Sequence, residues 1–262
     1  MIFGFGFGVG VGNSDEYSFE DSDALAYYNA IKDSNGGDID ANSIFNISLR
    51  NYQFAIDRFF IELKGYGVYN KLIQGHIFFG GGEYVHIDMI TLAPSNIEGS
   101  PLINKNGCFL DGVNDYVTLA FTTDGYPSNT NHGFSVDIVD LDGVINGRHF
   151  YYANNTFFMN ENSGNKSVRT FSSNSITADG GTGFFTHQGN ATTRYSYKDG
   201  VEFFSNAYTP TSLDSEPIIL GWNYLNFQKY GLGCCFVHEY LDETETSALN
   251  DALLDFKIRL GI

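Results

Sequence analysis

The sequence predicts a mainly β protein: an antiparallel β-sandwich with a small helical region before it and one helix after it. Three observations support that prediction. From about residue 73 onward, short runs of β-branched and aromatic residues alternate with turn-forming Gly, Asn and Asp. Two earlier segments and the last one show helical spacing of their apolar residues instead. With 42% hydrophobic residues, including 24 Phe and 17 Tyr, the 262-residue chain can bury a sizeable core.

The chain begins MIFGFGFGVGVG, in which large apolar residues alternate with glycine. An extended backbone would place these side chains on one face and leave the other face bare. Because glycine weakens an isolated strand, we expect residues 1–14 to be a docking segment that another protein orders with a groove or a sheet edge. A flexible tail and a first strand of the protein's own fold are the alternatives. The docking residues would be Phe3, Phe5, Phe7, Val9 and Val11.

Residues 15–72 are expected to be helical. A first helix would begin with Asp21 or Ser22 as N-cap and end at the glycines after Asn35. A second would cover 40–64, because its apolar residues are spaced alternately four and three apart. We expect this apolar face to pack against the sandwich or the first helix, with a short oligomer-forming bundle as the alternative. The spaced residues are Phe45, Leu49, Tyr52, Ile56, Phe59 and Leu63.

The sandwich is expected over 73–262, and a helix should close it. Asp242 and Glu245 have the spacing of a capping box at the start of that helix, and Gly261 would end it. Its buried stripe would be Leu249, Leu253, Phe256 and Leu260. The predicted strands are 84–92, 116–121, 134–139, 148–153, 168–171, 183–186, 193–197, 218–222 and 231–237.

Charge and cysteine usage exclude some classes of partner. A net charge of −17 disfavours nucleic acid, which binds through Lys and Arg on its phosphates. The sequence has no apolar run of about 18 residues and no basic leader, so we expect neither membrane insertion nor a signal peptide. Adjacent Cys234 and Cys235 point to opposite faces of a strand and cannot readily pair. A bridge from Cys108 to one of them is conceivable, but buried free thiols are the expectation.

Three segments resemble the laminin-G/concanavalin-A group of jelly-roll domains. FLDGVNDYV at 109–117 is similar to its early strand–turn–strand, and SYKDGV at 196–201 to its later hairpin. Residues 219–256 resemble its closing strands and terminal helix. The resemblance implies a concanavalin A-like or laminin G-like sandwich over roughly 73–262.

The whole chain resembles structural proteins of bacteriophages, notably those of Bacteroidetes hosts. The matching stretches are DSDALAYYNAIKDSNGGDID at 21–40 and NYQFAIDRFFIELKGYGVYNKL at 51–72, between a glycine-rich start and the sandwich. This resemblance implies a tail, tail-fibre or head-fibre component that is assembled in the host cytoplasm and located in the virion. Its partners would be other virion proteins, further copies of itself (such as a trimer) and a host surface glycan.

The sandwich class includes glycoside hydrolases, which work with two carboxylates on one strand face. The most similar stretch here, 135–140, has Ser135 at the nucleophile position and Asp137 at the acid position. A hydroxyl cannot replace that carboxylate, the six histidines lack metal-ligand spacing, and no G-x-S-x-G elbow occurs. We therefore expect no catalytic residues and no enzyme activity.

Two kinds of ligand site have candidate residues. Calcium could bind Asp140 and Asp142, or Asp111, Asn114 and Asp115, although Asp and Asn beside Gly are also common turn formers. No other cofactor or metal is expected. A glycan could contact exposed aromatic residues beside polar ones. The candidates are Trp222, Asn223 and Tyr224, and the segment 151–155.

The first functional hypothesis is thus a virion structural protein that docks by its N-terminus and presents the sandwich for assembly or host recognition. The second is a carbohydrate-binding adhesin module of a cell surface. A glycan hydrolase is the third.

Overall fold

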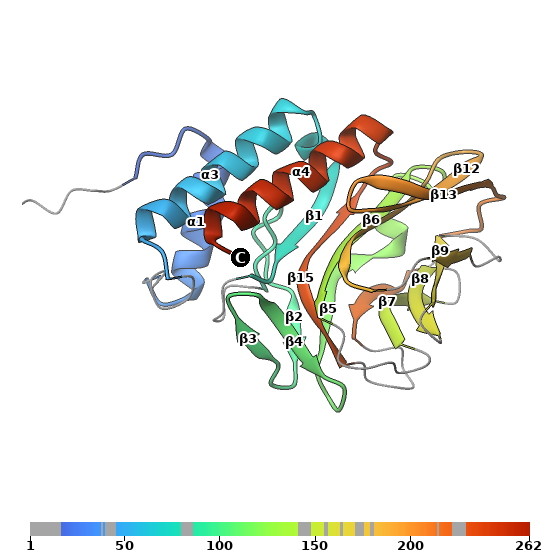
Figure 1. Ribbon diagram of the computed structural model, residues 1–262, viewed down its shortest axis with the longest axis horizontal. Helices are drawn as coiled ribbons and strands as arrows, with labels where there is room; N and C mark the ends of the chain where they lie inside the picture. Colours follow the sequence, from blue (N-terminus) through green and yellow to red (C-terminus); the bar gives the residue numbers. More distant parts are fainter. Residues whose placement is uncertain are drawn as a thin grey trace, which may run out of the picture.

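The computed structural model describes residues 17–37, 39, 46–79, 86–140, 181–213, 215–221 and 229–262, and the backbone of four strands between 148 and 178. In this part of the chain, two antiparallel sheets form a sandwich and three α-helices form a layer beside one of them (Figure 1). The predicted jelly-roll-like fold class is confirmed.

The first sheet has the strand order β13-β12-β11-β6-β15-β4-β3, and β1 also pairs with β15. All of these pairs are antiparallel. Its strands are β1 (Leu72–Ile77), β3 (Leu102–Asn104), β4 (Gly107–Asp111), β6 (His132–Asp140), β11 (Gly183–Gly189), β12 (Thr193–Lys198), β13 (Val201–Ala207) and β15 (Lys229–His238).

The second sheet has the order β10-β9-β8-β7-β14-β5-β2. The chain crosses from one sheet to the other at the turn between β4 and β5, which is the strand–turn–strand segment 109–117. The strands of the second sheet are β2 (Asn96–Glu98), β5 (Tyr116–Thr122), β7 (Arg148–Asn154), β8 (Phe157–Asn162), β9 (Asn165–Thr170), β10 (Ile176–Ala178) and β14 (Pro217–Leu220). Two short 3-10 helices, Tyr69–Lys71 and Thr123–Gly125, complete the described elements.

The helical layer consists of α1 (Ser22–Ser34), α3 (Leu49–Gly65) and α4 (Glu243–Leu260). In Figure 1, α3 and α4 lie side by side over the β1 and β15 region of the first sheet. The Phe59 ring of α3 is 5.1 Å from Phe256 of α4 and 6.3 Å from Phe236 of β15. The apolar face of α3 therefore packs inside the molecule, as expected for Tyr52, Ile56, Phe59 and Leu63.

Strand β6 shows how the first sheet separates the helical layer from the core of the sandwich. Asp137 forms an ion pair with Lys257 of α4, so its side of the strand faces the helices. Because neighbouring side chains alternate, Phe134, Val136 and Ile138 point to the other side, between the sheets. All three are fully buried there.

The predicted capping residues are confirmed for two helices, α1 and α4. The Asp21 side chain accepts hydrogen bonds from Asp23 N and Ala24 N and caps α1, which ends at Asn35 before Gly36 with a positive φ of 72°. Asp242 and Glu245 form the predicted capping box of α4, and Gly261 ends it in the left-handed conformation. The buried stripe of α4 is confirmed at Leu249, Leu253, Phe256 and Leu260.

The predicted start of the second helix was wrong. The helix begins at Leu49 rather than near 40, because Ser48 is extended and its hydroxyl accepts from Asn51 N as an N-cap. Asn46 just before it has a positive φ of 57°, which no α-helix accommodates. Leu49 is consequently at the end of the helix and exposed, and Phe45 lies outside the described residues.

A continuous strand over 84–92 was also wrong where the structure describes that segment. Only single bridges, His76 with Asp88 and Ile87 with Pro94, occur there. The buried Asp88 carboxylate accepts from Ile90 N and from the Thr91 hydroxyl, which closes a turn. Strands β1, β2, β3, β8 and β10 were not predicted individually.

The three cysteines are buried free thiols, as expected. Burial raises the pKa of the Cys108 thiol to about 12 and those of Cys234 and Cys235 well above their usual value. Among the helices that the structure describes, none is both long and apolar enough to cross a membrane.

Candidate binding site at the C-terminal end of α4

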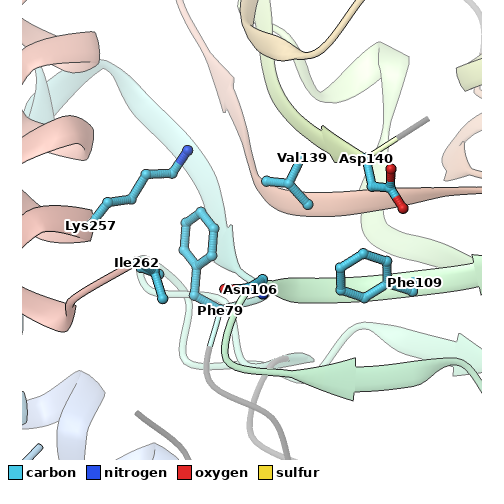
Figure 2. A pocket seen from close by; sticks show the side chains of 7 residues that line it. All are labelled: Phe79, Asn106, Phe109, Val139, Asp140, Lys257 and Ile262. Atoms are coloured by element: carbon cyan, nitrogen blue, oxygen red, sulfur yellow. The ribbon is translucent and has the colours of Figure 1, made fainter. Parts of the chain in front are cut away.

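An open hollow of about 440 Å³ lies where the C-terminal end of α4 meets the first sheet (Figure 2). Two aromatic rings and three polar side chains contribute to it. Its lining consists of Phe79, Asn106, Phe109, Val139, Asp140, Lys257 and Ile262.

Phe79 is positioned by β15. It is the second residue after β1, and the backbone N of Phe78, between them, donates to the carbonyl oxygen of Gly233 (2.9 Å). Gly233 is required here, because a Cβ at this position would lie 2.0 Å from Asp137 Oδ2 and 2.6 Å from the Phe79 ring. A bulge in β15 at this glycine thus makes room for both the aromatic ring and the carboxylate.

Asn106 and Phe109 reach the hollow from the β3–β4 hairpin. The Asn106 backbone N donates to the Asn104 side chain (2.8 Å), which fixes the turn. Phe109 lies opposite Gly231 of β15, where a Cβ would approach the ring to 2.9 Å. This glycine lets the Phe109 ring lie against β15 at the edge of the hollow, where the ring is half-buried.

Lys257 supplies the positive charge of the site. Its Nζ is 2.6 Å from Asp137 Oδ2 and 5.0 Å from the centre of the Phe79 ring. The Asp137 side chain is only 3% exposed and that of Lys257 22%. Burial raises the pKa of Asp137, and the attraction of Lys257 only partly offsets that effect.

A second hollow of about 310 Å³ shares Lys257 with the first. Asp199 there accepts a hydrogen bond from Phe184 N (2.8 Å), so the turn after β12 is tied to β11. Asp199 and Gly200 both have positive φ values, 51° and 78°, as the predicted hairpin at 196–201 requires. The lining consists of Asp137, Gly183, Phe184, Asp199, Asn250, Leu253, Leu254 and Lys257.

Most of the candidate residues from the sequence fall outside these hollows. The exceptions are Asp140, a calcium candidate that lines the first hollow, and Asp137 from the hydrolase comparison, which lines the second. The docking residues Phe3, Phe5, Phe7, Val9 and Val11 and the glycan candidates Trp222, Asn223 and Tyr224 all lie outside the described residues. So do Asp142, Asn155 and the side chains of residues 151–154. The expectations attached to them remain predictions.

Ser135, at the nucleophile position of the hydrolase comparison, is fully buried. Its hydroxyl is hydrogen-bonded to Thr186 Oγ1 (2.8 Å) and His238 Nε2 (2.9 Å). Asp137, two residues on, is engaged by Lys257. Ser135 and Asp137 therefore do not provide the two catalytic carboxylates with which a glycoside hydrolase works.

The calcium candidates at 111–115 serve as a turn. Asp111 Oδ1 accepts from the backbone N of Val113 (2.7 Å) and Asn114 (3.1 Å). Although desolvation acts in the opposite direction, these amides lower the pKa of Asp111. The buried Asp115 carboxylate accepts from Ser100 N and Asp111 N. Across the described ranges, no three His, Cys, Asp or Glu side chains form a group that could hold a metal ion.

Sequence reasoning missed Phe79, Asn106, Phe109 and Lys257 as site residues. Lys257 carries a local signal as a cation in the last turn of α4, but the helix dipole favours a cation there whether or not a ligand binds. Phe79 and Lys257 are brought together by the pairing of β1 with β15, which no local pattern encodes.

No protein-family model and no curated protein sequence matches the chain. Solved structures do match the chain. The botulinum neurotoxin serotype D binding domain is 16% identical with a TM-score of 0.55, and the match covers 70% of this chain and 52% of that one. A structure of botulinum neurotoxin type C, whose cell entry depends on interaction with two ganglioside molecules, is 13% identical with a TM-score of 0.53 and covers 71% and 52%.

A sialidase of Trypanosoma rangeli, solved with a difluoro-KDN ligand, is 10% identical with a TM-score of 0.53 and covers 69% of this chain and 32% of that one. The chain therefore spans about half the length of the neurotoxin structures and a third of the sialidase. At these identities the likeness establishes the β-sandwich fold alone.

Proposed function

We propose that this protein is a non-catalytic binding module that recognises a glycan in the hollow at the C-terminal end of α4. The observation that carries the proposal is the convergence of the half-buried Phe109 ring, backed by the buried Phe79 ring, with Asn106, Asp140 and Lys257 on one open hollow. Small-molecule sites typically combine an apolar lining with a few polar groups that fix orientation. A sugar ring presents an apolar face and hydroxyl groups, and this lining offers a counterpart to each.

The structural neighbours support a binding role. The neurotoxin structures are a receptor-binding part and a ganglioside-dependent toxin, so β-sandwiches of this shape occur in proteins that attach to cell surfaces. The complete burial of Ser135 and the ion pair of Asp137 support the absence of catalysis, since the Ser135 hydroxyl is not accessible to a ligand and the Asp137 carboxylate is engaged by Lys257.

The test is binding of the full chain to a glycan array, followed by calorimetry on the glycans that bind. Phe109→Ala should weaken that binding about tenfold, the scale of one well-placed aromatic contact. Val113→Ala, 69% exposed in the turn after the same strand, is the matched control and should bind normally. The proposal fails if the folded protein binds no glycan, or if Phe109→Ala binds as tightly as the wild type.

A second candidate function is a virion structural component that docks through residues 1–14. One observation favours it beyond the resemblance of the whole chain to phage proteins. Residues just after the docking segment are fixed on α3: the Tyr17 hydroxyl, Glu20 N and Asp21 N all donate to the buried Asp57 carboxylate, at 2.6, 3.0 and 2.9 Å. A segment held by a partner would thus be joined firmly to the folded body.

Deleting residues 1–14 should leave the unfolding transition unchanged, since the Asp57 contacts begin at Tyr17. The deletion should also remove the protein from assembled particles, including any trimers that it forms there. Particles that carry the truncated protein at normal copy number would contradict docking through this segment.

A further inference from the structure

We propose that the two hollows that share Lys257 are one extended site, which binds an uncharged oligosaccharide rather than a single sugar or an acidic glycan. This inference rests on the proposed glycan-binding function and adds the length and charge of the ligand. Lys257 lines both hollows, so they meet at its side chain.

The two elements that border the hollows agree on the length of the combined site. Along β6, Asp137 lines the second hollow and Asp140 the first, about 10 Å apart at the usual rise of a strand. Along α4, the lining of the second hollow alone extends from Asn250 to Lys257, also about 10 Å at the usual rise of a helix, and the first hollow adds Ile262 beyond it. The combined lining therefore extends over a length that one sugar ring does not cover.

Each hollow offers the same two kinds of contact. The first has the Phe79 and Phe109 rings beside the exposed amide of Asn106. The second has the exposed Leu254 beside the half-buried amide of Asn250. A repeated pairing of apolar surface with an amide suits a ligand that itself repeats, and a chain of sugar rings is such a ligand. At 440 and 310 Å³, each hollow alone is at the lower end of the usual range for ligand pockets.

Charge argues against an acidic ligand. Among the described residues that line the hollows, Lys257 is the only cation, and it is already paired with Asp137, while two further carboxylates, Asp140 and Asp199, border the hollows. The whole chain adds a net charge of −17. A carboxylate on the ligand would be repelled, whereas hydroxyl groups can accept from the remaining Lys257 donors and donate to the carboxylates.

The experiment measures affinity by calorimetry for neutral oligosaccharides of the cello, malto, xylo and manno series, each from monosaccharide to hexasaccharide. Sialyllactose is the acidic probe. Affinity should rise with length within the series that binds until both hollows are occupied, and sialyllactose should bind more weakly than a neutral trisaccharide.

Two amide variants separate the hollows. Asn250→Ala should weaken binding of the hexasaccharide about fivefold, the scale of one hydrogen bond, and leave the disaccharide unaffected. Asn106→Ala should weaken both. Asn114→Ala, exposed in the turn after β4, is the control and should bind as the wild type does.

The possible failures are distinguishable. Loss of binding in Asn106→Ala with no effect of Asn250→Ala at any length would overturn the extended site and leave the proposed function standing. Tighter binding of sialyllactose would overturn the uncharged ligand. No binding by any member of the four series or the array would overturn the proposed function and this inference with it.

Discussion

The two ends of α4 differ in what their polar groups contact. At the N-terminal end, Asp242 Oδ1 accepts from Glu245 N (2.9 Å) and Glu245 Oε2 accepts from Asp242 N (2.8 Å). The buried Gln188 joins this end to the first sheet: its Nε2 donates to the Leu241 carbonyl and the Thr246 hydroxyl, and its Oε1 accepts from Leu241 N. These capping and linking groups all have partners within the fold.

Towards the C-terminal end, by contrast, Lys257 and Ile262 border open hollows, the second of which extends back to Asn250 near the middle of the helix. The Phe109 ring and the amides of Asn106 and Asn250 there are half-buried or exposed, and Lys257 forms its ion pair within the described part of the chain with Asp137. The comparison teaches that one helix can stabilise the fold with its first turns and provide a binding surface with its last ones.

The largest expected effect is a difference in the free energy of unfolding between the buried and the exposed face of the C-terminal half of α4. Leu253 is 2% exposed and its neighbour Leu254 is 52% exposed. Leu253→Ala should lower the free energy of unfolding by about 3 kcal/mol, because it removes buried methyl groups and leaves a cavity. Leu254→Ala should change it by less than about 0.5 kcal/mol and instead weaken binding of long oligosaccharides. Chemical denaturation and calorimetry measure the two effects, and equal losses of stability would contradict the assignment.

A smaller effect is expected at the N-terminal end. Gln188→Ala leaves the buried N–H and C=O of Leu241 without partners and should lower the free energy of unfolding by about 2 kcal/mol. Thr246→Val removes one of the same hydrogen bonds and should lower it by about 1 kcal/mol. Neither should change glycan affinity. A loss of glycan affinity in a folded Gln188→Ala protein would contradict the assignment of stability to the N-terminal end of α4 and of binding to its C-terminal end.

The smallest expected effect is a pH dependence of the free energy of unfolding that arises from Asp137. Burial raises the pKa of this carboxyl above that of the unfolded chain, so the folded protein retains a proton that the unfolded chain releases. The stability from this group is therefore full below about pH 4 and is lost as the pH rises through the folded pKa. Asn cannot ionise, so Asp137→Asn should gain stability relative to the wild type across that window.

Denaturation midpoints of both proteins from pH 4 to about pH 8 measure this gain. A stability difference that is constant with pH, or one that shrinks as the pH rises, would contradict the effect of burial on Asp137.

The sequence predicted those parts of the fold whose signals are local. The caps at Asp21 and Asp242, the stop at Gly261 and most of the strands follow from short patterns that the structure retains. The strand prediction for 84–92 was wrong because alternating apolar residues do not distinguish a strand from a turn. Here the buried Asp88 carboxylate accepts from a backbone amide and forms such a turn. Leu92, with a positive φ of 58°, could not continue a strand in any case.

The site was not predictable in this way. Phe79, Phe109 and Lys257 come from three distant segments. The register of β1 and β4 on β15 places the two rings, and the packing of α4 on the sheet adds Lys257. The two glycines that admit the rings, Gly231 and Gly233, resemble any other glycines in a strand until that register is known. Without it, the aromatic residues of this chain cannot be divided into core and site.

The most direct test of the account follows backbone amide chemical shifts of the labelled full chain as the tightest-binding neutral oligosaccharide is added. We predict shifts at Asn106, Phe109, Asp140 and Lys257, extending to Asn250 with the longer ligands, and none from Leu241 to Thr246. Shifts confined to Leu241–Thr246, or to residues outside both hollows, would contradict the assignment of binding to the open end of α4.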